Sequence, residues 1–361
     1  MSLERLTLTE THTLPICHDG PVHNGKVRSV YWLNQEDSSR LILKHSYHAD
    51  VDAQLGIMVI SDRISAFECN WKGEGGLHGV PYKGASLNVI SKYFFDKIVK
   101  EEIGEHHILA VPHPLVWIVE RAEPVMIEAI ARQYIAGGMW RAYANGEREF
   151  CGIRLPEGLK ENQRLDELLY TPTTKGIIRG IPGIPEEDDV NISRNQILQN
   201  YHTFGFKKLT DIDLCEAMVR DAFPVISAEY ARCGKIFVDT KFEFGYSGHE
   251  LMFIDEVGTP DSSRMWDAKL YKQGKVMENS KEGFRQFLLK TYDREILLDK
   301  KRMAERRNLA ETVRVPIDEM VDVSETYKDL AEQITRAKMP EIMRVRDEII
   351  ASLKPLGVIE Q

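Results

Sequence analysis

The stretch that decides the fold is Ile236-Phe-Val-Asp239-Thr-Lys241-Phe-Glu243-Phe-Gly245, and the run Leu251-Met-Phe-Ile-Asp255-Glu256 follows it closely. Both runs are rich in β-branched and aromatic residues, as strands are. The intervening Tyr246-Ser-Gly-His249 is a turn signal. We therefore expect the two runs to fold back on each other as an antiparallel hairpin.

The register of this hairpin decides which carboxylates meet. Residue numbers of cross-strand partners have a constant sum, and closing the hairpin near His249 places Glu243 opposite Asp255. Opposed carboxylates repel unless a cation joins them, and Mg²⁺ is typically held by one or two carboxylates plus phosphate oxygens. The pattern predicts a magnesium site formed by Glu243 and Asp255.

Two alternatives to this site stay open. A turn centred on Ser247 would oppose Asp239 to Asp255, which keeps an acidic cluster but changes its ligands. In the other alternative, Glu243 and Asp255 are solvated residues at strand ends that pair with Lys241.

Length and composition set the general class. The chain has 361 residues, of which 43% are hydrophobic and 29% charged, so it is a folded protein of about two domains. The net charge of −9 and the sequence pI of 5.7 provide no general attraction for polyanions. We expect no nucleic acid partner.

Features of export and membrane insertion are missing from the sequence. Residues 1–11 lack a basic segment followed by an apolar core, and the apolar run Ile108–Val119 is shorter than the ~20 residues of a membrane-spanning helix. The five cysteines are scattered and contain no Cys-x-x-Cys pair. These features predict a soluble cytoplasmic protein with reduced thiols and no membrane partner.

The distribution of patterns suggests three segments, which are a β-rich lobe over 1–122, a central α+β lobe over 123–295 and a charged helical segment over 296–361. The boundary signal is the turn at Pro124. Strands are expected at Lys26–Leu33, Arg40–His45, Gly56–Ile60, Leu115–Val119 and Lys235–Asp239. Helices are expected at Ser86–Ile103, Asp211–Gly234, 292–309, Glu325–Arg336 and Glu341–Leu353. Whether the last helices cover the chain's own core or a second subunit stays open, so a homo-oligomer is an option.

A polar loop follows the hairpin at Thr259-Pro-Asp261-Ser-Ser263-Arg264-Met-Trp266. It combines a carboxylate, two hydroxyls and a guanidinium, which together could hold an anionic substrate and an amine. The alternative is a plain Pro-Asp turn with a serine cap. Another loop, Ile181-Pro-Gly-Ile-Pro185 with the acidic residues after it, is expected to be mobile.

A third candidate lies near the N-terminus at Asn24-Gly25-Lys26-Val-Arg28. Backbone N–H groups near Gly25 and the Lys26 ammonium could cover nucleotide phosphates, although the stretch is not a Walker A loop and could be a surface turn. The sequence contains neither Gly-x-Ser-x-Gly nor Gly-x-Gly-x-x-Gly, which argues against α/β-hydrolases and Rossmann oxidoreductases.

Taken together and in order, these segments resemble the SAICAR synthetase family of purine biosynthesis. The stretches that carry the resemblance are Gly25–Arg28, Ser61–Phe67, Lys83-Gly84, Glu128–Arg132, Thr171–Lys175, Asp189–Ser193, Asp239–Gly245 and Asp255–Trp266. The resemblance implies an α+β fold with two lobes, antiparallel sheets, a kinase-like nucleotide cleft and a helical C-terminal segment. It also implies an ATP- and Mg²⁺-dependent ligase that joins the carboxylate of CAIR to the amino group of L-aspartate, giving SAICAR, ADP and phosphate by way of an acyl phosphate.

The resemblance assigns roles to individual residues. ATP and its magnesium are assigned to Gly25, Lys26, Arg28, Glu128, Glu243 and Asp255, with the metal on the last two. Catalysis is assigned to Lys241, Asp239 and Asp261, with Lys241 neutralising the transferred phosphoryl group. Substrate binding is assigned to Asp62, Ser65, Arg132, Asp189, Ser263 and Arg264, of which Arg132 and Arg264 hold the ribotide.

Some positions depart from the family pattern. Glu68 stands where an Asp is usual, Tyr82 replaces a glycine, and Gly138 replaces a serine that contacts the ribotide phosphate. Two rival functions remain at this point. One is another ATP-dependent kinase or ligase on the same scaffold. The other is a non-catalytic nucleotide-binding regulator, which would be expected to lack part of the set Lys26, Lys241, Glu243 and Asp255.

Overall fold

The structure is a computed structural model that describes residues 6–360, so residues 1–5, part of the stretch examined for a leader, lie outside the described residues. The chain forms two compact units. Unit 1 contains Met1–Lys92, Ile108–Arg121 and Ser280–Gln361, and unit 2 contains Tyr93–His107 and Ala122–Asn279. The residues from Ser280 onward therefore belong to the same compact unit as the N-terminal residues. The sequence pattern had instead suggested a separate segment over 296–361. No helix within 6–360 is long and apolar enough to cross a membrane.

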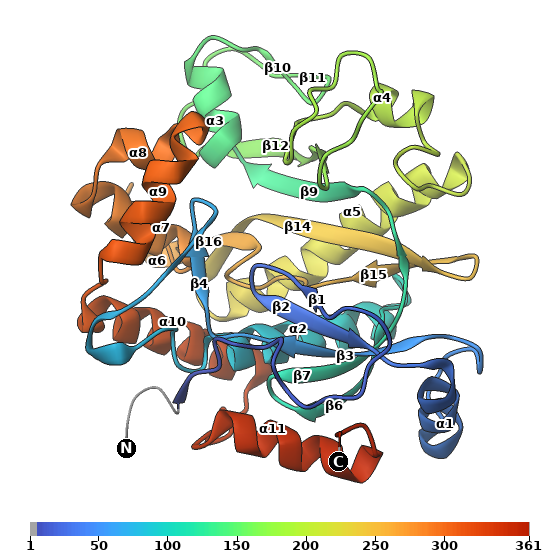
Figure 1. The fold of residues 1–361 in the computed structure, drawn as a ribbon. Helices are drawn as coiled ribbons and strands as arrows, with labels where there is room; N and C mark the ends of the chain where they lie inside the picture. Colours follow the sequence, from blue (N-terminus) through green and yellow to red (C-terminus); the bar gives the residue numbers. More distant parts are fainter. Residues whose placement is uncertain (1–5, 361) are drawn as a thin grey trace. The chain divides into compact units, whose positions relative to one another are not determined.

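Unit 1 is built on an antiparallel sheet with the strand order β1-β2-β3-β7-β6 (Figure 1). Its strands are β1 His23–Asn24, β2 Arg28–Trp32, β3 Leu55–Ile60, β6 Ile108–His113 and β7 Val116–Glu120. The central strands β3 and β7 are buried along almost their whole length, as their continuous apolar runs indicate. The predicted strands at Lys26–Leu33, Gly56–Ile60 and Leu115–Val119 are confirmed, with shifts of one or two residues at their ends.

The predicted strand at Arg40–His45 is wrong, because these residues end helix α1, Gln35–His45. Asn34 is the N-cap, and its side chain accepts a hydrogen bond from the Asp37 N–H. Acidic residues occupy the first turn and basic residues the last, as the helix dipole favours. These end signals outweigh the local apolar run, of which Leu43 is 69% exposed.

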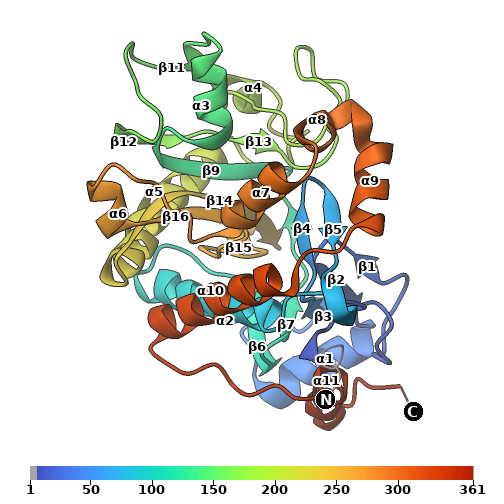
Figure 2. The ribbon, with the colours of Figure 1, turned by 90° about the vertical axis from the view of Figure 1, so that its left-hand side faces the viewer.

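A small hairpin and the C-terminal helices complete unit 1. The hairpin consists of β4 Ile64–Ala66 and β5 Cys69–Trp71. The helices are α7 Lys281–Thr291, α8 Arg294–Leu298, α9 Met303–Thr312, α10 Ile317–Thr335 and α11 Val345–Leu353. Short 3-10 turns lie at η2 Glu74–Gly76, η3 Lys300–Arg302 and η4 Lys354–Leu356. The C-terminal segment thus packs on its own chain, and α7, α8 and α9 lie beside the hairpin (Figure 2).

Unit 2 is built on a second antiparallel sheet, with the order β12-β9-β14-β15 and with β13 on β9 and β16 and β8 on β14. Its strands are β8 Glu123–Pro124, β9 Ile127–Tyr134, β12 Arg164–Tyr170, β13 Thr173–Thr174, β14 Lys235–Ser247, β15 Glu250–Ile254 and β16 Ser263–Asp267. The hairpin β10 Glu149–Phe150 and β11 Ile153–Arg154 is separate. The mixture of helices and antiparallel sheets in both units confirms the α+β class.

The helices of unit 2 are α3 Gly137–Ala144, α4 Arg194–Gln199, α5 Thr210–Arg232 and α6 Ala268–Lys272, and the residues of α2, Lys83–Lys100, divide between the units. The predicted long helix at Asp211–Gly234 is confirmed as α5, which packs on β14. The rings of Phe223 and Tyr230 on α5 each lie 5.0 Å from the ring of Phe237 on β14. This apolar contact fixes the back of the strand that carries the charged residues described next.

Candidate functional site

The long strand β14 organises the charged residues of unit 2. It pairs with β9 through Asp239–Phe242 and with β16 through Lys235–Thr240. Because side chains alternate along a strand, Asp239, Lys241 and Glu243 share one face, while Phe242 is buried on the other. The three charged residues of the sequence motif therefore project to the same side of the sheet.

Asp239 connects two arginines from the neighbouring strands. It lies opposite Arg132 on β9 and opposite Arg264 on β16. The same oxygen, Oδ2, accepts from Arg132 Nη1 at 2.7 Å and from Arg264 Nη1 at 2.5 Å. Arg132 Nε also donates to Thr171 Oγ1 at 2.9 Å. The geometry brings together three expected site residues that are up to 132 positions apart in the sequence.

The electrostatics of this group favour an anion. Burial alone would raise the pKa of Asp239, but Arg264 and Arg132 lower it below its ordinary value. Burial lowers the pKa of Arg132, although an arginine keeps its charge at any physiological pH. Two guanidinium groups thus share one carboxylate, and guanidinium groups are well suited to bind a phosphate or carboxylate.

A glycine allows Arg264 to pack closely. Gly137 at the start of α3 has φ +57°, and a Cβ built there would lie 2.6 Å from Cζ of Arg264. The backbone is in the left-handed region that glycine tolerates without strain. Gly138, the position at which the resemblance predicts a serine, is different, because a Cβ there would meet only Arg141 Nη2, at 3.7 Å.

A second group surrounds the Lys241 ammonium. Nζ donates to Glu128 Oε1 at 2.8 Å and to Glu243 Oε1 at 2.5 Å. The other oxygen of Glu243 forms an ion pair with Lys175, and Thr173 Oγ1 donates to Glu128 Oε2 at 3.2 Å. Strands β9, β13 and β14 thus hold an alternating network of carboxylates and ammonium groups.

Burial and neighbouring charges shift the pKa values of the groups in this network. Burial would lower the pKa of Lys241, but the carboxylates of Glu243, Glu128 and Asp255 raise it well above its ordinary value. For Glu243, burial is opposed by Lys241 and Lys175, which lower its pKa to about 2. Desolvation raises the pKa of Glu128, although the charge and the hydrogen bond of Lys241 act to lower it. Lys241 and Glu243 therefore form a charged pair near neutral pH.

The network fits a divalent cation by its charge. Three carboxylates, those of Glu128, Glu243 and Asp255, face two ammonium groups, those of Lys175 and Lys241, which leaves one negative charge in excess. Within residues 6–360, no group of three or more His, Cys, Asp or Glu side chains is arranged to hold a metal. A Mg²⁺ ion here would therefore use Glu243 or Asp255 and complete its shell with phosphate oxygens and water. At Glu243 it would replace one of the two ammonium contacts.

The predicted register of the hairpin is wrong by one residue. The turn is Gly248-His249, so Ser247 pairs with Glu250 and Glu243 pairs with Ile254 rather than with Asp255. The alternative register, with Asp239 opposite Asp255, is wrong as well. Asp255 follows the last residue of β15 with φ +62°, and its backbone carbonyl lies 3.4 Å from His107 Nε2. Its charge nevertheless acts on Lys241, so the acidic cluster survives the shift.

The site residues expected in the loops, Ser263, Asp261 and Asp189, differ in their exposure and in their contacts. Ser263 pairs with Thr240, its hydroxyl lies 2.8 Å from Thr240 Oγ1, and it is 6% exposed, on the face opposite Arg264. Asp261 is half-buried in the turn before β16. Asp189 is exposed with φ +58°, and its charge raises the pKa of Glu128 slightly further. Asp189 thus acts on the charged network through Glu128.

In unit 1, the turn between β1 and β2 contains the expected phosphate-binding residues. Gly25 N–H donates to the Arg28 carbonyl at 2.8 Å, so this amide is used within the turn. Lys26 is exposed, and the guanidinium of Arg28 lies 5.8 Å from the ring centre of Trp117. The turn therefore offers one exposed ammonium group, that of Lys26.

Asp62 and Ser65, expected in substrate binding, are largely buried. Asp62 is 1% exposed, and its oxygens accept from the N–H groups of Leu8 and Gly84 at 2.8 and 2.9 Å. Burial raises the pKa of Asp62 to about 7, against the two backbone hydrogen bonds and Lys83. Asp62 thus holds backbone segments in this conformation, whereas a substrate contact was expected. Ser65 is 8% exposed and accepts from Lys281 Nζ at 3.1 Å.

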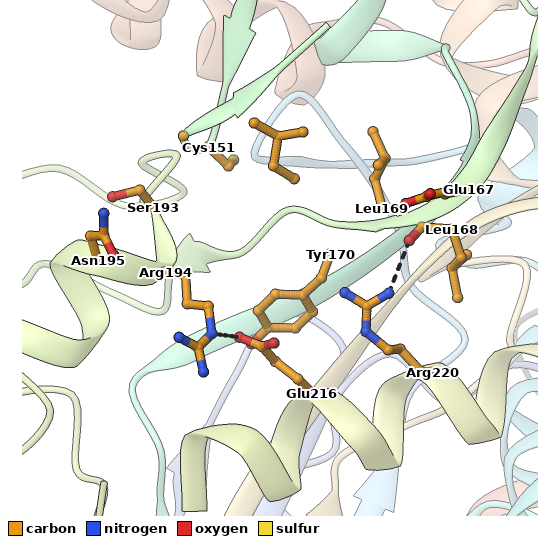
Figure 3. A pocket seen from close by; sticks show the side chains of 12 residues that line it. Cys151, Glu167, Leu168, Leu169, Tyr170, Ser193, Arg194, Asn195, Glu216 and Arg220 are labelled. Atoms are coloured by element: carbon orange, nitrogen blue, oxygen red, sulfur yellow. Dashed lines mark hydrogen bonds and ion pairs between the residues drawn. The ribbon is translucent and has the colours of Figure 1, made fainter. Parts of the chain in front are cut away.

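A separate pocket of about 380 Å³ lies in unit 2 among β12, α4 and α5 (Figure 3). Two of its arginines have partners, since Arg194 pairs with Glu216 at 2.8 Å and Arg220 donates to the Leu168 carbonyl at 3.3 Å. Burial raises the pKa of Cys151 in its wall to about 12, so this thiol is protonated. The lining of this pocket contains none of the expected site residues.

Lys175 lies in the stretch Thr171–Lys175, which carries part of the family resemblance, but no role was expected for it from the sequence. The structure pairs Lys175 with Glu243, and Thr171 with Arg132. Lys175 directly follows β13, and the pairing of β13 with β9 brings it beside Glu243. Only the tertiary pairing shows that this lysine reaches the acidic network.

Fold and site together define an α+β protein in which one sheet presents a two-arginine anion site beside a buried acidic and lysine network. Comparison with known sequences gives this class a family: the SAICAR synthetase profile matches residues 43–296. The chain belongs to the SAICAR synthetase family.

Similar proteins cover the whole chain. The phosphoribosylaminoimidazole-succinocarboxamide synthase of Vibrio cholerae serotype O1 is 55% identical over 368 residues, covering 100% of both chains. The enzyme of the same name from Shewanella baltica is 54% identical over 360 residues, covering 98% of both. Among solved structures, the SAICAR synthase of Saccharomyces cerevisiae complexed with SAICAR aligns with a TM-score of 0.66 and 24% identity, covering 92% of this chain and 99% of that one. A type-2 SAICAR synthetase in complex with ADP aligns with a TM-score of 0.56 and 21% identity, covering 89% and 100%. The structural likeness supports the fold.

Proposed function

We propose that this protein catalyses the ATP-dependent condensation of CAIR with L-aspartate to SAICAR, with release of ADP and phosphate. The proposal rests on family membership and on full-length relatives of 54–55% identity that are named phosphoribosylaminoimidazole-succinocarboxamide synthase. It includes a cytoplasmic location, which the five free cysteines support.

The chemistry explains why such a site needs many charges and no nucleophilic side chain. A carboxylate resists attack by an amine because its leaving group would be oxide. Transfer of the γ-phosphoryl group of ATP to a carboxylate oxygen of CAIR forms an acyl phosphate and ADP. The aspartate amine then attacks the acyl carbon, the C–O bond to phosphate breaks, and phosphate and a proton leave. Positioning and charge neutralisation carry most of the catalysis of phosphoryl transfer.

The network around Lys241 is suited to the phosphoryl end of this reaction. We assign Glu243 and Asp255 to magnesium, which would neutralise phosphate charge when bound. Lys241 and Lys175 would stabilise negative charge on the transferred group, and Glu128 holds Lys241 in place. In unit 1, Gly25, Lys26 and Arg28 remain assigned to the ATP phosphates.

The two arginines on Asp239 are suited to the ribotide. Arg132 and Arg264 supply the positive charge that a phosphate or carboxylate group requires, and Asp239 accepts a hydrogen bond from each of them. The assignments of Asp261, Ser263, Asp62, Ser65 and Asp189 to substrate stay part of the proposal. The structural observation that supports these residue assignments best is the adjacency, on one strand, of the two-arginine site at Asp239 and the Lys241–Glu243 network.

A kinase or ligase acting on other substrates would use the same phosphoryl chemistry. ADP release should therefore be measured with CAIR alone, with L-aspartate alone and with both, using wild type and Lys241→Met. We expect sustained ADP release and SAICAR formation only with both substrates, and a loss of both in the variant. Full ADP release without L-aspartate would indicate a kinase or ATPase and would overturn the proposal.

A further inference from the structure

The turn of the β4–β5 hairpin has an unfavourable backbone conformation. Phe67 and Glu68 form the turn, with φ +53° and +63°. Such turns usually contain Asn or Gly, because other residues pay a steric cost in the left-handed region. Conformations of this kind persist where the surroundings fix them, and they are concentrated at functional sites. The hairpin begins in the Ser61–Phe67 stretch of the family pattern.

Arg306 of α9 holds this turn. It is 2% exposed, and its Nη1 donates to the Phe67 carbonyl at 3.2 Å. Its other nitrogens bind the carbonyls of Ile296 at 3.1 Å and Asp299 at 2.9 Å. One guanidinium therefore ties the turn of the hairpin to two points of the α8–α9 segment, and its rigid fork is suited to this use.

Lys281, the first residue of α7, reaches the strand of the same hairpin. It is 8% exposed, and its Nζ donates to Ser65 Oγ at 3.1 Å. Ser280 caps α7 by accepting from the Glu282 N–H, which fixes the start of the helix next to the hairpin. Lys281 thus controls the orientation of a hydroxyl that the proposed function assigns to substrate.

Apolar contacts join the same two segments. Two-stranded hairpins are marginally stable alone. Here the hairpin residues Ile64 and Trp71 belong to one core with Phe284, Leu288 and Ala310 of the C-terminal helices. After α9 the chain continues this contact, since the Val315 N–H donates to the Lys72 carbonyl at 2.9 Å.

We infer that residues 280–315 form a brace for the β4–β5 hairpin, in which Lys281 and Arg306 are positioning residues for the Ser61–Phe67 stretch. The brace gives a function to the charged segment that the family motifs do not explain. The inference rests on the proposed function to the extent that Ser65 belongs to the substrate site.

Steady-state kinetics with CAIR and L-aspartate test Lys281. We expect Lys281→Met to raise the KM of one of the two substrates about tenfold, the effect of losing one charged hydrogen bond, with kcat nearly unchanged. Lys281→Arg should restore most of the loss, and Lys290→Met, an exposed lysine on the same helix, should match wild type. A Lys281→Met variant with both KM values unchanged would overturn the role of Lys281, whatever its melting temperature.

Hydrogen exchange tests Arg306 independently of activity. In Arg306→Lys, the amides of 64–71 should exchange at least tenfold faster than in wild type, while Arg307→Lys, an exposed neighbour, should leave them unchanged. Unchanged exchange over 64–71 in Arg306→Lys would refute the brace. If wild type makes no SAICAR, the proposed function fails, whereas the exchange result still decides whether the brace exists.

Discussion

Asp239 lies opposite Arg132 in the β14–β9 ladder, and Arg132 Nη1 donates to Asp239 Oδ2 over 2.7 Å. Both side chains are less than 10% exposed. The same carboxylate oxygen also accepts from Arg264, so Asp239 joins two guanidinium groups. Its charge therefore serves the stability of the sheet as well as the geometry of the proposed ribotide site.

The first prediction concerns this carboxylate. Asp239→Asn leaves two largely buried cations without their counter-ion and should reduce the free energy of unfolding by about 3–5 kcal/mol. Urea denaturation followed by circular dichroism measures the change. Asp166→Asn, at an exposed position of β12, serves as the control and should behave like wild type. Equal denaturation midpoints for Asp239→Asn and wild type would show that the ion pairs do not stabilise the fold.

The second prediction concerns the metal. Glu243→Gln and Asp255→Asn each remove a charge from the Lys241 network and should lower kcat at saturating Mg²⁺ about hundredfold or more. Both variants should keep a folded circular dichroism spectrum, because Glu243 lies on β14 and Asp255 directly follows β15, and backbone ladders fix both strands. ADP release under saturating substrates measures kcat. A rate close to wild type in either variant would remove that residue from the metal site.

The third prediction uses two adjacent glycines. Gly138 has room for a side chain, so Gly138→Ser should fold normally and supply the hydroxyl that the resemblance predicts at this position, lowering the KM for CAIR several-fold. Gly137→Ser should instead displace Arg264 and raise that KM, because its Cβ would clash with the guanidinium and its φ is +57°. CAIR titrations at fixed ATP and L-aspartate compare the two. Parallel effects of both substitutions would contradict this account of the α3 N-terminus.

The fourth prediction concerns pH. The pKa of Asp62 is about 7 in the folded chain, against 3.8 for an ordinary Asp, so the folded state binds more protons than the unfolded state between these values. The contribution of this group to stability is complete below pH 3.8 and is lost as the pH rises to about 7. The slope approaches about 1.4 kcal/mol per pH unit within that window.

Asp62→Asn isolates this contribution, because an amide does not titrate. Urea unfolding of both proteins between pH 4 and pH 8 should show the stability of wild type declining relative to the variant up to about pH 7 and then staying level. A difference that is constant over the whole range would mean that Asp62 has an ordinary pKa in the fold.

Much of the fold can be predicted from the sequence because apolar periodicity and end signals act locally. The strand at Gly56–Ile60 and the helix around Asp211–Gly234 have continuous apolar or amphipathic patterns, and the structure confirms both. The stretch Arg40–His45 fails because a short apolar run fits either a strand or a helix. The helix begins with the N-cap Asn34, which lies outside this run, so the run alone does not show that it is helical.

The candidate site shows a different limit. The residues of the charged network lie in the quoted motifs, but their contacts depend on strand register, and a shift of one residue changes every partner. Because the turn consists of the two residues Gly248 and His249, Glu243 pairs with Ile254 and not, as predicted, with Asp255. The pairing of β13 with β9, which brings Lys175 to Glu243, joins segments that are distant in sequence and cannot be derived from spacing.

In the proposed reaction, ATP activates the carboxylate of CAIR for attack by L-aspartate. CAIR labelled with oxygen-18 in its carboxylate tests this step, with mass spectrometry of the released phosphate and of SAICAR. We expect one labelled oxygen to move from the carboxylate to phosphate for each SAICAR formed. Released phosphate without label would contradict this activation step. Sustained transfer of label to phosphate in the absence of L-aspartate would contradict it as well.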